Sequence, residues 1–462
     1  MLGPVLRVSW PGWERAVGRV WFESLTGFEE TDGAGVVDRF REDGPFLESM
    51  VNGRRMRRGD FSVVALADLR RRRVEGDPIG YVGETTVSEV IADVRELHAD
   101  PSAAGATFQV ASQFNMLEMI SPQVTPEAGI DLYELDRTQG PACAVACGAG
   151  TIHRNYFVPF EDGDQTVRGQ TADRQLDGFA DLAAALGLDV DMRNGYALLT
   201  PEQLQRSSER LNVLTEPQRD ELAGLLRVGV QADSEVTWRD AGHTVTQVFC
   251  SALPIAYAGG QQRQWEPLAR LVLDAAYEAT FAAAVRSAAR SGNRTLYLTL
   301  LGAGAFGNPV AWVVEALQRS LRLHRYAGLD VRIVSYGRSQ PALRVLDEEA
   351  PSWADPLFGD RPAQWGMRGD PHLWRELHAA LRAVTPEPTS RAELANLLAS
   401  QVFRLAGVDV GSSDDRAVQI PRFPATGMSG GYVAPAFWRD VAVPLLLDRW
   451  VEAARDEPGR PG

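Results

Sequence analysis

The chain contains no lysine: each of its 47 residues counted as lysine or arginine is an arginine. This absence excludes a P-loop lysine, a Schiff-base lysine and a lysine general base. Cysteine is scarce too, because Cys143, Cys147 and Cys250 are an odd number too small for a disulfide framework. No apolar run reaches the ~20 residues of a membrane-spanning helix, and no signal-peptide pattern opens the sequence. We therefore expect a cytoplasmic protein that does not contact a membrane.

Positive charge is in deficit. The net charge is −14, from 61 acidic and 47 basic residues. A protein that binds nucleic acid or anionic membranes through its general surface carries the opposite excess, so neither partner is expected. The arginine-rich runs at 54–58 and 70–73 are predicted to lie on the solvated surface. With 45% hydrophobic and 23% charged residues, the composition is that of a globular protein with a sizeable core, and the length predicts more than one domain.

One stretch, TLYLTLLGAGAFGNPVAWVVEALQRSLRL at 295–323, predicts a complete strand, loop and helix. Residues 296–301 are expected to form a buried strand, and the helix is expected to begin with Asn308 as N-cap and Pro309 at its first position. The loop at 302–307 is rich in glycine, which lets the backbone approach a ligand. Free N–H groups beside a helix N-terminus favour an anion such as a phosphate. Two interpretations stay open, an anion-binding loop and a tight turn.

The order of the predicted elements divides the chain. Residues 1–78 form an N-terminal extension to which we assign no role. Residues 79–345 alternate strands with helices, which predicts an α/β domain with a mostly parallel sheet covered on both faces and a ligand at the carboxyl ends of its strands. Within it, residues 158–242 are predicted to be a helical insertion, with Thr200 and Thr215 as helix N-caps. Residues 346–365 are predicted to be a linker and residues 366–462 a small helical domain.

Four motifs occur in an order that resembles the macrodomain family, the ADP-ribose-binding fold. They are ADV at 92–94, QVASQFN at 109–115, QGPACAVACGAG at 139–150 and LLGAGAFGNP at 300–309. The segments VFCSALPIAY and VRIVSYG fit the same order. The resemblance covers residues 82–340 and implies a three-layer α/β/α macrodomain-like mixed sheet, here with an N-terminal extension, a helical insertion and a C-terminal helical domain.

The resemblance also implies a site for ADP-ribose or an ADP-ribosylated protein, with no cofactor. Asp93 would accept a hydrogen bond from the adenine amine, and Tyr336 would stack on adenine. The QFN strand end would meet the distal ribose, and the glycine-rich loop would hold the diphosphate with backbone N–H groups. The ligand-binding residues implied in this way are Asp93, Val94, Gln113, Asn115, Thr138, Gln139, Gly140, Gly302, Gly304, Ala305, Phe306, Gly307, Asn308 and Tyr336.

The chain departs from the family pattern in two places. Many macrodomain hydrolases have Gly-Gly-Gly ahead of the second helix, where this chain has DRTQGPAC. It also lacks the Gln-Glu-Glu run of poly(ADP-ribose) glycohydrolases. Cleavage of polymer or of ester-linked ADP-ribose by those routes is therefore not predicted.

An acidic loop indicates a different leaving group. Glu118, Glu127, Asp131 and Asp136 fall beside the implied distal ribose, and carboxylates bind the planar guanidinium of an arginine bidentately. One carboxylate could orient that guanidinium while another activates a water at the anomeric carbon. We predict Asp131 and Asp136 as the catalytic pair and Glu118 as a third catalytic residue; the part of Glu127 stays open. The structural alternatives are that Asp136 is a capping or first-turn acid of the next helix and that Glu118 pairs with an arginine.

A metal is not expected. Cys143 and Cys147 are spaced i, i+4 near His153, but no further pair of ligands follows at zinc spacing.

The resemblance and the acidic loop together favour the function of an ADP-ribosylhydrolase that removes mono-ADP-ribose from protein side chains, with arginine linkage preferred. The alternative is a non-enzymatic reader of ADP-ribose or a related nucleotide.

Overall fold

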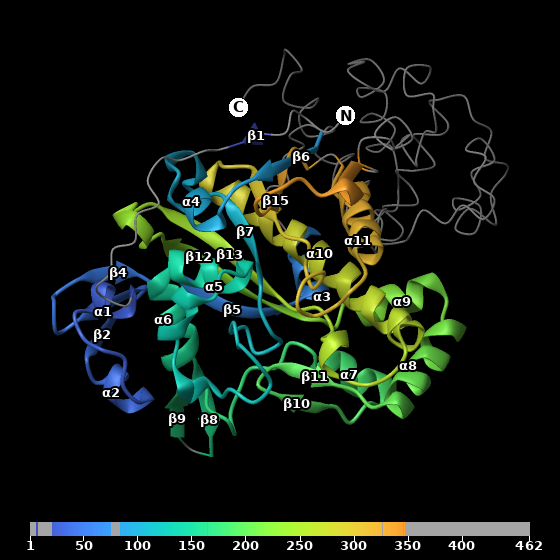
Figure 1. Cartoon of the computed structure of the whole chain (residues 1–462), viewed down its shortest axis with the longest axis horizontal. Helices are drawn as coiled ribbons and strands as arrows, with labels where there is room; N and C mark the ends of the chain where they lie inside the picture. Colours follow the sequence, from blue (N-terminus) through green and yellow to red (C-terminus); the bar gives the residue numbers. More distant parts are fainter. Residues whose placement is uncertain are drawn as a thin grey trace, which may run out of the picture.

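In this computed structural model, the described residues are 6–7, 21–74, 84–163, 165–325, 327–344 and 346. The predicted helical domain at 366–462 and nearly all of the predicted linker at 346–365 lie outside them. Figure 1 shows the arrangement of the described elements around one large sheet.

The central sheet has eight strands in the order β1-β6-β15-β14-β7-β13-β12-β5. All neighbouring pairs are parallel except those of β12, which is antiparallel to both β13 and β5. The predicted mixed, mostly parallel sheet is thus confirmed. In sheet order, the strand bounds are Leu6–Arg7, Thr86–Ile91, Asp330–Ser335, Thr295–Leu298, Thr107–Ala111, Thr244–Cys250, Arg227–Glu235 and Asp60–Ala65.

Helices cover both faces of this sheet. Successive side chains along a strand point to opposite faces, so the buried residues of one strand belong to two different hydrophobic clusters. On β13, Val248 and Cys250 belong to the hydrophobic cluster built on α10 and α11, while Val245 and Phe249 belong to the cluster on the other face, which includes residues of α4 and α5. The helices of the first face are α3 (Leu66–Val74), α10 (Gln262–Ser291) and α11 (Val310–Leu323), and those of the second are α4 (Val94–Ala99), α5 (Gln139–Ala146) and α6 (Gly148–Tyr156). The predicted three-layer α/β/α architecture is present.

The sheet extends past the domain boundaries predicted from the sequence. Strand β5 lies within the predicted N-terminal extension, and β12 lies within the predicted insertion, yet the two pair with each other over residues 60–65 and 227–232. The reason is that β12 contains buried positions that only a neighbouring strand and a helix layer can cover. The inserted elements are therefore those between α6 and β12. They are β8 (Pro159–Asp162), β9 (Gln165–Arg168), α7 (Ala180–Leu186), β10 (Asp191–Arg193), β11 (Tyr196–Leu198), α8 (Pro201–Val213) and α9 (Glu216–Ala223).

The predicted N-caps of the inserted helices are confirmed. At the start of α8, the Thr200 hydroxyl accepts from the Gln203 N–H, and the Gln203 side chain accepts from the Thr200 N–H. Thr215 is the N-cap of α9, and its N–H donates to the side chain of Gln218. Each reciprocal pair satisfies N–H groups that a helix start would otherwise leave without a partner.

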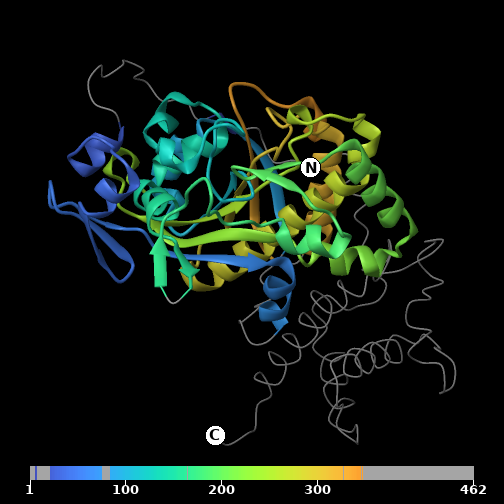
Figure 2. The same ribbon diagram turned by 90° about the horizontal axis from the view of Figure 1, so that it is seen from below.

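The N-terminal elements form a small layer at one end of the sheet, and α8 and α9 lie towards the other end (Figure 2). This layer has its own core, in which Phe22, Phe28, Phe40 and Phe157 pack edge to face in sequence. Its elements are α1 (Trp21–Thr26), α2 (Gly33–Val37), β2 (Phe40–Asp43), β3 (Phe46–Ser49) and β4 (Arg55–Arg57).

One arginine predicted to be solvated is buried. Arg70, on α3, forms ion pairs with Glu278 of α10 and with Asp220 of α9, and Arg319 of α11 pairs with the same two carboxylates. Four helices thus meet at one buried charge network. A sequence run such as RRRR reveals the charges but not the carboxylates that other helices bring to them.

Candidate functional site

A pocket of about 230 Å³ lies at the carboxyl ends of β7, β13 and β14, the edge at which ligands bind in sheets of this kind. Its wall combines the end of β7, the N-terminus of α5 and the glycine-rich loop after β14. The lining residues fall at 111–113, 118–120, 136, 138–141, 196, 252, 257, 299–302 and 304–306. Segments that are far apart in the sequence therefore meet in one cavity.

The glycine-rich loop presents unpaired backbone N–H groups. Those of Gly302, Gly304, Ala305 and Phe306 have no acceptor among the described residues, whereas those of Gly307 and Asn308 donate to carbonyls within the loop. Four of these residues line the pocket, but Gly307 and Asn308 do not. An array of free N–H groups is a binding surface for an anion such as a phosphate.

The shape of this loop depends on Gly302 and Asn308. Gly302 has φ +73°, and an added Cβ would lie 2.4 Å from Cβ of Ala252. The Asn308 side chain donates to the carbonyls of Leu253 (2.9 Å) and Gly302 (3.3 Å). The prediction that Asn308 is the N-cap of α11 was therefore wrong: Pro309 occupies that position and the helix starts at Val310, because the Asn308 side chain closes the loop.

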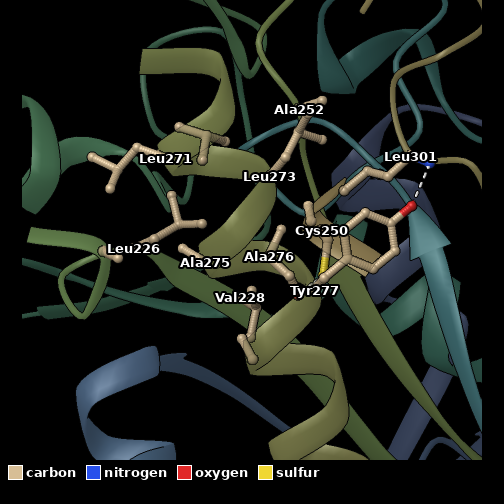
Figure 3. Packing of buried hydrophobic residues seen from close by; sticks show 14 of the residues in the cluster. Leu226, Val228, Cys250, Ala252, Leu271, Leu273, Ala275, Ala276, Tyr277 and Leu301 are labelled. Atoms are coloured by element: carbon tan, nitrogen blue, oxygen red, sulfur yellow. Dashed lines mark hydrogen bonds between the residues drawn. The ribbon is translucent and has the colours of Figure 1, made fainter. Parts of the chain in front are cut away.

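Tyr277, on α10, holds the start of the glycine-rich loop through two hydrogen bonds. Its hydroxyl donates to the Thr299 carbonyl (2.6 Å) and accepts from the Leu301 N–H (3.0 Å). Figure 3 shows this ring reaching Leu301 from among the buried residues of α10 and β13. The side chain of Gln109 also accepts from the Thr299 N–H. These contacts end β14 at Leu298, three residues before the predicted strand end.

The N-terminus of α5 forms the opposite part of the wall. Its N-cap, Thr138, makes no side-chain capping bond, and the N–H groups of Gln139 and Gly140 have no acceptor in the described part of the chain. The Gln139 side chain instead binds β7, accepting from Ala111 N–H (2.8 Å) and donating to the Gln109 carbonyl (2.6 Å). The helix start is thus held against the strand end with its N–H groups available to an anion.

Gly140 allows this close approach. A Cβ there would lie 2.0 Å from the Ala111 carbonyl oxygen and 3.1 Å from Cγ of Glu118. Gly140→Ala is expected to lower the free energy of unfolding by ~1–3 kcal/mol, because backbone must move to admit the methyl group. Gly259→Ala is the matched control, since no atom lies within 4 Å of its added Cβ. Urea titration measures both, and equal stability of the two variants would contradict the packing argument.

Glu118 is the buried carboxylate of the pocket. The side chain of Gln113 holds its loop, accepting from the Met119 N–H (2.5 Å) and donating to the Met119 carbonyl (3.0 Å). Arg154, also fully buried, lies 3.3 Å from Glu118 and stacks on Phe249. Burial raises the pKa of Glu118 to about 7, against the opposite effect of Arg154. A carboxyl group with such a pKa is suited to exchange a proton at neutral pH.

Of the predicted catalytic pair, one member lines the pocket. Asp136 does so, and one of its oxygens accepts from the Thr138 N–H (2.8 Å); it is neither the N-cap of α5, which is Thr138, nor an acid of the first turn. Asp131 is absent from the lining. Burial, and then the charges of Glu30 and Glu134, raise the pKa of Asp131 to about 6. The structure therefore brings Asp136 together with Glu118, and leaves Asp131 beside the N-terminal layer.

Of the residues predicted to bind adenine and the distal ribose, only Gln113 lines the pocket. Asp93 is the N-cap of α4 and pairs with Arg95 (2.9 Å), while Val94 is buried in the core. Tyr336 is 59% exposed just after β15, at the same sheet edge as the pocket but outside its lining. Asn115 is fully buried, and its amide donates to Gln175. Gln113 does line the pocket, but its amide group is occupied by Met119.

Sequence reasoning missed three residues of this site. Arg154 belongs to a helix of small residues, and its burial against Glu118 follows from no local pattern. Tyr196 comes from the β10–β11 hairpin inside the insertion, and Tyr257 from a 3₁₀ turn at Ile255–Tyr257. Tyr257 is the last residue of the segment VFCSALPIAY, which was the one available signal for it.

Within the described residues, neither a cluster of metal-ligand side chains nor a helix able to span a membrane is found. Cys143 and Cys147 are buried free thiols, and burial raises the pKa of Cys147 to about 12. No group of three or more histidine, cysteine or acidic side chains is placed to hold a metal within the described ranges. Among the helices described, none has the length and apolarity required to cross a bilayer.

The fold and the pocket define an α/β protein with a backbone-lined cavity at the carboxyl edge of a mixed sheet. No protein-family profile matches the chain, and no curated protein matches it in sequence. Among solved structures, the chain is similar to poly(ADP-ribose) glycohydrolase from Deinococcus radiodurans in complex with ADP-ribose. One crystal form shares 12% identity over 63% of this chain and 95% of that chain, with a TM-score of 0.33. A second crystal form shares 13% identity over 63% of this chain and 94% of that chain, with a TM-score of 0.32. A mutant of the same glycohydrolase shares 12% identity over 62% of this chain and 93% of that chain, with a TM-score of 0.33. At these values the similarity concerns the general fold and says nothing of activity.

Proposed function

We propose that the protein is an ADP-ribosylhydrolase that removes mono-ADP-ribose from protein side chains, with arginine linkage preferred. The observation that supports this most directly is the pocket itself, in which free N–H groups of the glycine-rich loop and of the α5 N-terminus share one cavity with Glu118. Such N–H groups suit the diphosphate. The motif order that resembles the macrodomain family names ADP-ribose as the diphosphate ligand.

In the proposed reaction, Glu118 acts as the general base. It takes a proton from a water that attacks the anomeric carbon, while the bond to the arginine nitrogen breaks through an oxocarbenium-like transition state. The free oxygen of Asp136 orients the guanidinium, which leaves as neutral guanidine and regains its proton from solvent or from the protonated Glu118. Asp131 has no part in this scheme, because it does not line the pocket.

A non-enzymatic reader is the second candidate, and one observation favours it. Both carboxylates of the pocket already have partners, since Glu118 pairs with Arg154 and Asp136 accepts from Thr138. A site that only binds ADP-ribose would use these groups to shape the cavity. Binding and release therefore have to be measured separately.

Titration with ADP-ribose tests both candidates. We expect the melting temperature to rise with ligand concentration, since a ligand that binds only the folded state stabilises it by RT ln(1 + [L]/Kd). The absence of any shift at millimolar ADP-ribose would exclude hydrolase and reader together. If the ligand binds, release of ADP-ribose from arginine-linked, glutamate-linked and serine-linked protein decides between them.

The two aspartates give a sharper comparison. Asp136→Asn is expected to slow release from the arginine-linked substrate by roughly 10–100-fold, the loss of one hydrogen bond to a charged group. Asp131→Asn is expected to leave the rate within about twofold, because a residue outside the pocket does not touch the substrate. Initial rates at saturating substrate measure both. The reverse order of effects would return the chemistry to Asp131.

A further inference from the structure

Three aromatic rings form one wall of the pocket. The ring centroids of Tyr196, Tyr257 and Phe306 lie 5.1, 5.3 and 5.7 Å apart, and all three residues line the cavity that also contains Glu118 and Asp136. They come from an inserted hairpin, a 3₁₀ turn and the glycine-rich loop. Aromatic rings and acidic residues thus line one cavity.

Tyr196 is the first residue of β11, which forms the inserted hairpin with β10 (Figure 1). Asn194 and Gly195 both have positive φ, as the two central residues of a tight hairpin turn require. An added Cβ at Gly195 would lie 2.6 Å from Cβ of Gln113, so the turn sits directly on the strand end. The Tyr196 hydroxyl donates to the Met119 carbonyl at 2.8 Å, one residue beyond Glu118. The hairpin therefore fixes this ring next to the loop that carries Glu118.

Tyr257 is the exposed member of the wall. It is 38% exposed, whereas Tyr196 is 1% exposed. The turn that carries it is attached to the glycine-rich loop, because the Ala256 N–H donates to the Phe306 carbonyl at 3.0 Å. Its backbone is thus fixed while much of its ring stays open to a ligand.

Aromatic faces and carboxylates together recognise one class of group. A guanidinium is planar, permanently charged and weakly hydrated; it stacks on aromatic rings and pairs with carboxylates. The ester carbonyl of a glutamate linkage and the ether oxygen of a serine linkage carry no positive charge, so the negative face of a ring does not attract them. The combination of walls therefore favours a cationic group over a neutral one.

We infer that Tyr257 is a specificity-determining residue, whose ring stacks on the guanidinium of an arginine-linked substrate. This inference rests on the proposed function, since it concerns the group attached to the anomeric carbon in that site. The inserted hairpin then contributes to the selection of substrate, because its Tyr196 supports the ring of Tyr257 together with Phe306 of the glycine-rich loop.

The test measures binding, so that it does not depend on turnover. In the full-length Glu118→Gln protein, the Kd for ADP-ribose and the Kd for ADP-ribosyl-arginine are determined by calorimetry, with Tyr257 intact, changed to Phe and changed to Leu. With Tyr257 intact, ADP-ribosyl-arginine is expected to bind more tightly than ADP-ribose. Tyr257→Phe should keep that preference within about twofold, and Tyr257→Leu should reduce it about tenfold, which lies between the values for an exposed and a desolvated cation–π contact. The Kd for ADP-ribose itself should be equal in all three.

Four results would overturn the inference. A preference that survives Tyr257→Leu shows that the ring does not contact the guanidinium. Equal loss of affinity for both ligands shows that the ring contacts the nucleotide. If ADP-ribose binds to none of the proteins, the proposed function fails and the inference falls with it, whereas binding without a preference for ADP-ribosyl-arginine refutes the inference alone.

Discussion

Replacing Glu118 by Gln is expected to slow release of ADP-ribose by ~10²–10⁴-fold, the usual contribution of a general base. The amide keeps the size of the side chain but cannot accept the proton of the attacking water. Affinity for ADP-ribose should change little, since the loop and helix N–H groups that are proposed to bind the diphosphate are untouched. Single-turnover rates and calorimetric binding separate the two effects.

The same residue predicts a pH dependence. Because the pKa of Glu118 is raised to about 7, the ionised form that acts as a base increases as pH rises through 7. The rate should therefore increase between about pH 6 and 8 and then level off. In Glu118→Gln this rise should disappear. A rate that falls over the same range would assign Glu118 the role of general acid.

Glu127→Gln is the matched control for Glu118→Gln. It makes the same chemical change in the same acidic loop, but the Glu127 side chain lies outside the pocket lining and accepts from the Ala172 N–H. Its rate should stay close to that of the wild type. Melting curves of both variants are needed, because Glu118→Gln leaves Arg154 buried with a weaker partner. A Glu118→Gln protein that is folded, binds ADP-ribose and retains the wild-type rate would exclude Glu118 as the base.

The largest effect on stability is expected at Glu278, the centre of the buried charge network. Glu278→Gln should lower the free energy of unfolding by ~3–5 kcal/mol, because Arg70 and Arg319 lose the main carboxylate that pairs with their charges. Arg70 contacts Glu278 at 2.6 Å, as does Arg319. Both side chains of the Arg70–Glu278 pair are almost fully buried, so water cannot replace the missing partner. Urea titration at pH 7 measures the difference.

The stabilisation should also depend on pH. Burial alone would raise the pKa of Glu278, but the charges of Arg319 and Arg70 together lower it. A carboxyl group with a lowered pKa stabilises the fold above its unfolded pKa of about 4.3, and the effect is lost as pH falls through the folded value. The gap between wild type and Glu278→Gln should thus be complete at pH 7 and narrow in acid.

Glu315→Gln provides the control for this experiment. Glu315 of α11 pairs with Arg270 of α10, the two helices that the Arg319–Glu278 pair also joins, but the Glu315 side chain is 54% exposed. Removing a solvated ion pair costs ~0–1 kcal/mol, because water screens both charges. If Glu278→Gln were no more destabilised than Glu315→Gln, the network would not hold α3, α9, α10 and α11 together.

Local patterns in the sequence predicted the elements that depend on local physics. The β-branched segments gave the parallel strands, and the Thr200 and Thr215 caps placed the starts of α8 and α9. For the glycine-rich loop, the local pattern left an anion-binding loop and a tight turn open, and the macrodomain resemblance favoured the first; in the structure the loop lines the pocket. For Gln139 and Gly140 it was the resemblance to the macrodomain family, and not a local pattern, that implied a place in the site; both line the same cavity.

Contacts between distant segments were beyond these patterns. The pairing of β5 with β12 joins residues more than 160 positions apart, and no local signal specifies such a partner. The sequence gives no reason to distinguish Asp131 from Asp136, since both are acids of the same loop. Asp131 nevertheless lies beside the N-terminal layer and Asp136 lines the pocket, because a 3₁₀ turn at Asp131–Leu135 separates them. The same holds for Arg70, whose burial depends on carboxylates from α9 and α10.

The sequence by itself determined the α/β class, the strand edge at which a ligand can bind and the N–H groups available there, since these follow from periodicity, glycine positions and helix starts. Only the tertiary structure decided which carboxylate shares the cavity with those N–H groups. In the tertiary structure Glu118 is buried and paired with Arg154, Asp131 lies outside the pocket lining, and Tyr196 of the inserted hairpin contacts Tyr257. The physical reason is that burial, and with it the pKa and reach of a side chain, depends on every segment packed around it.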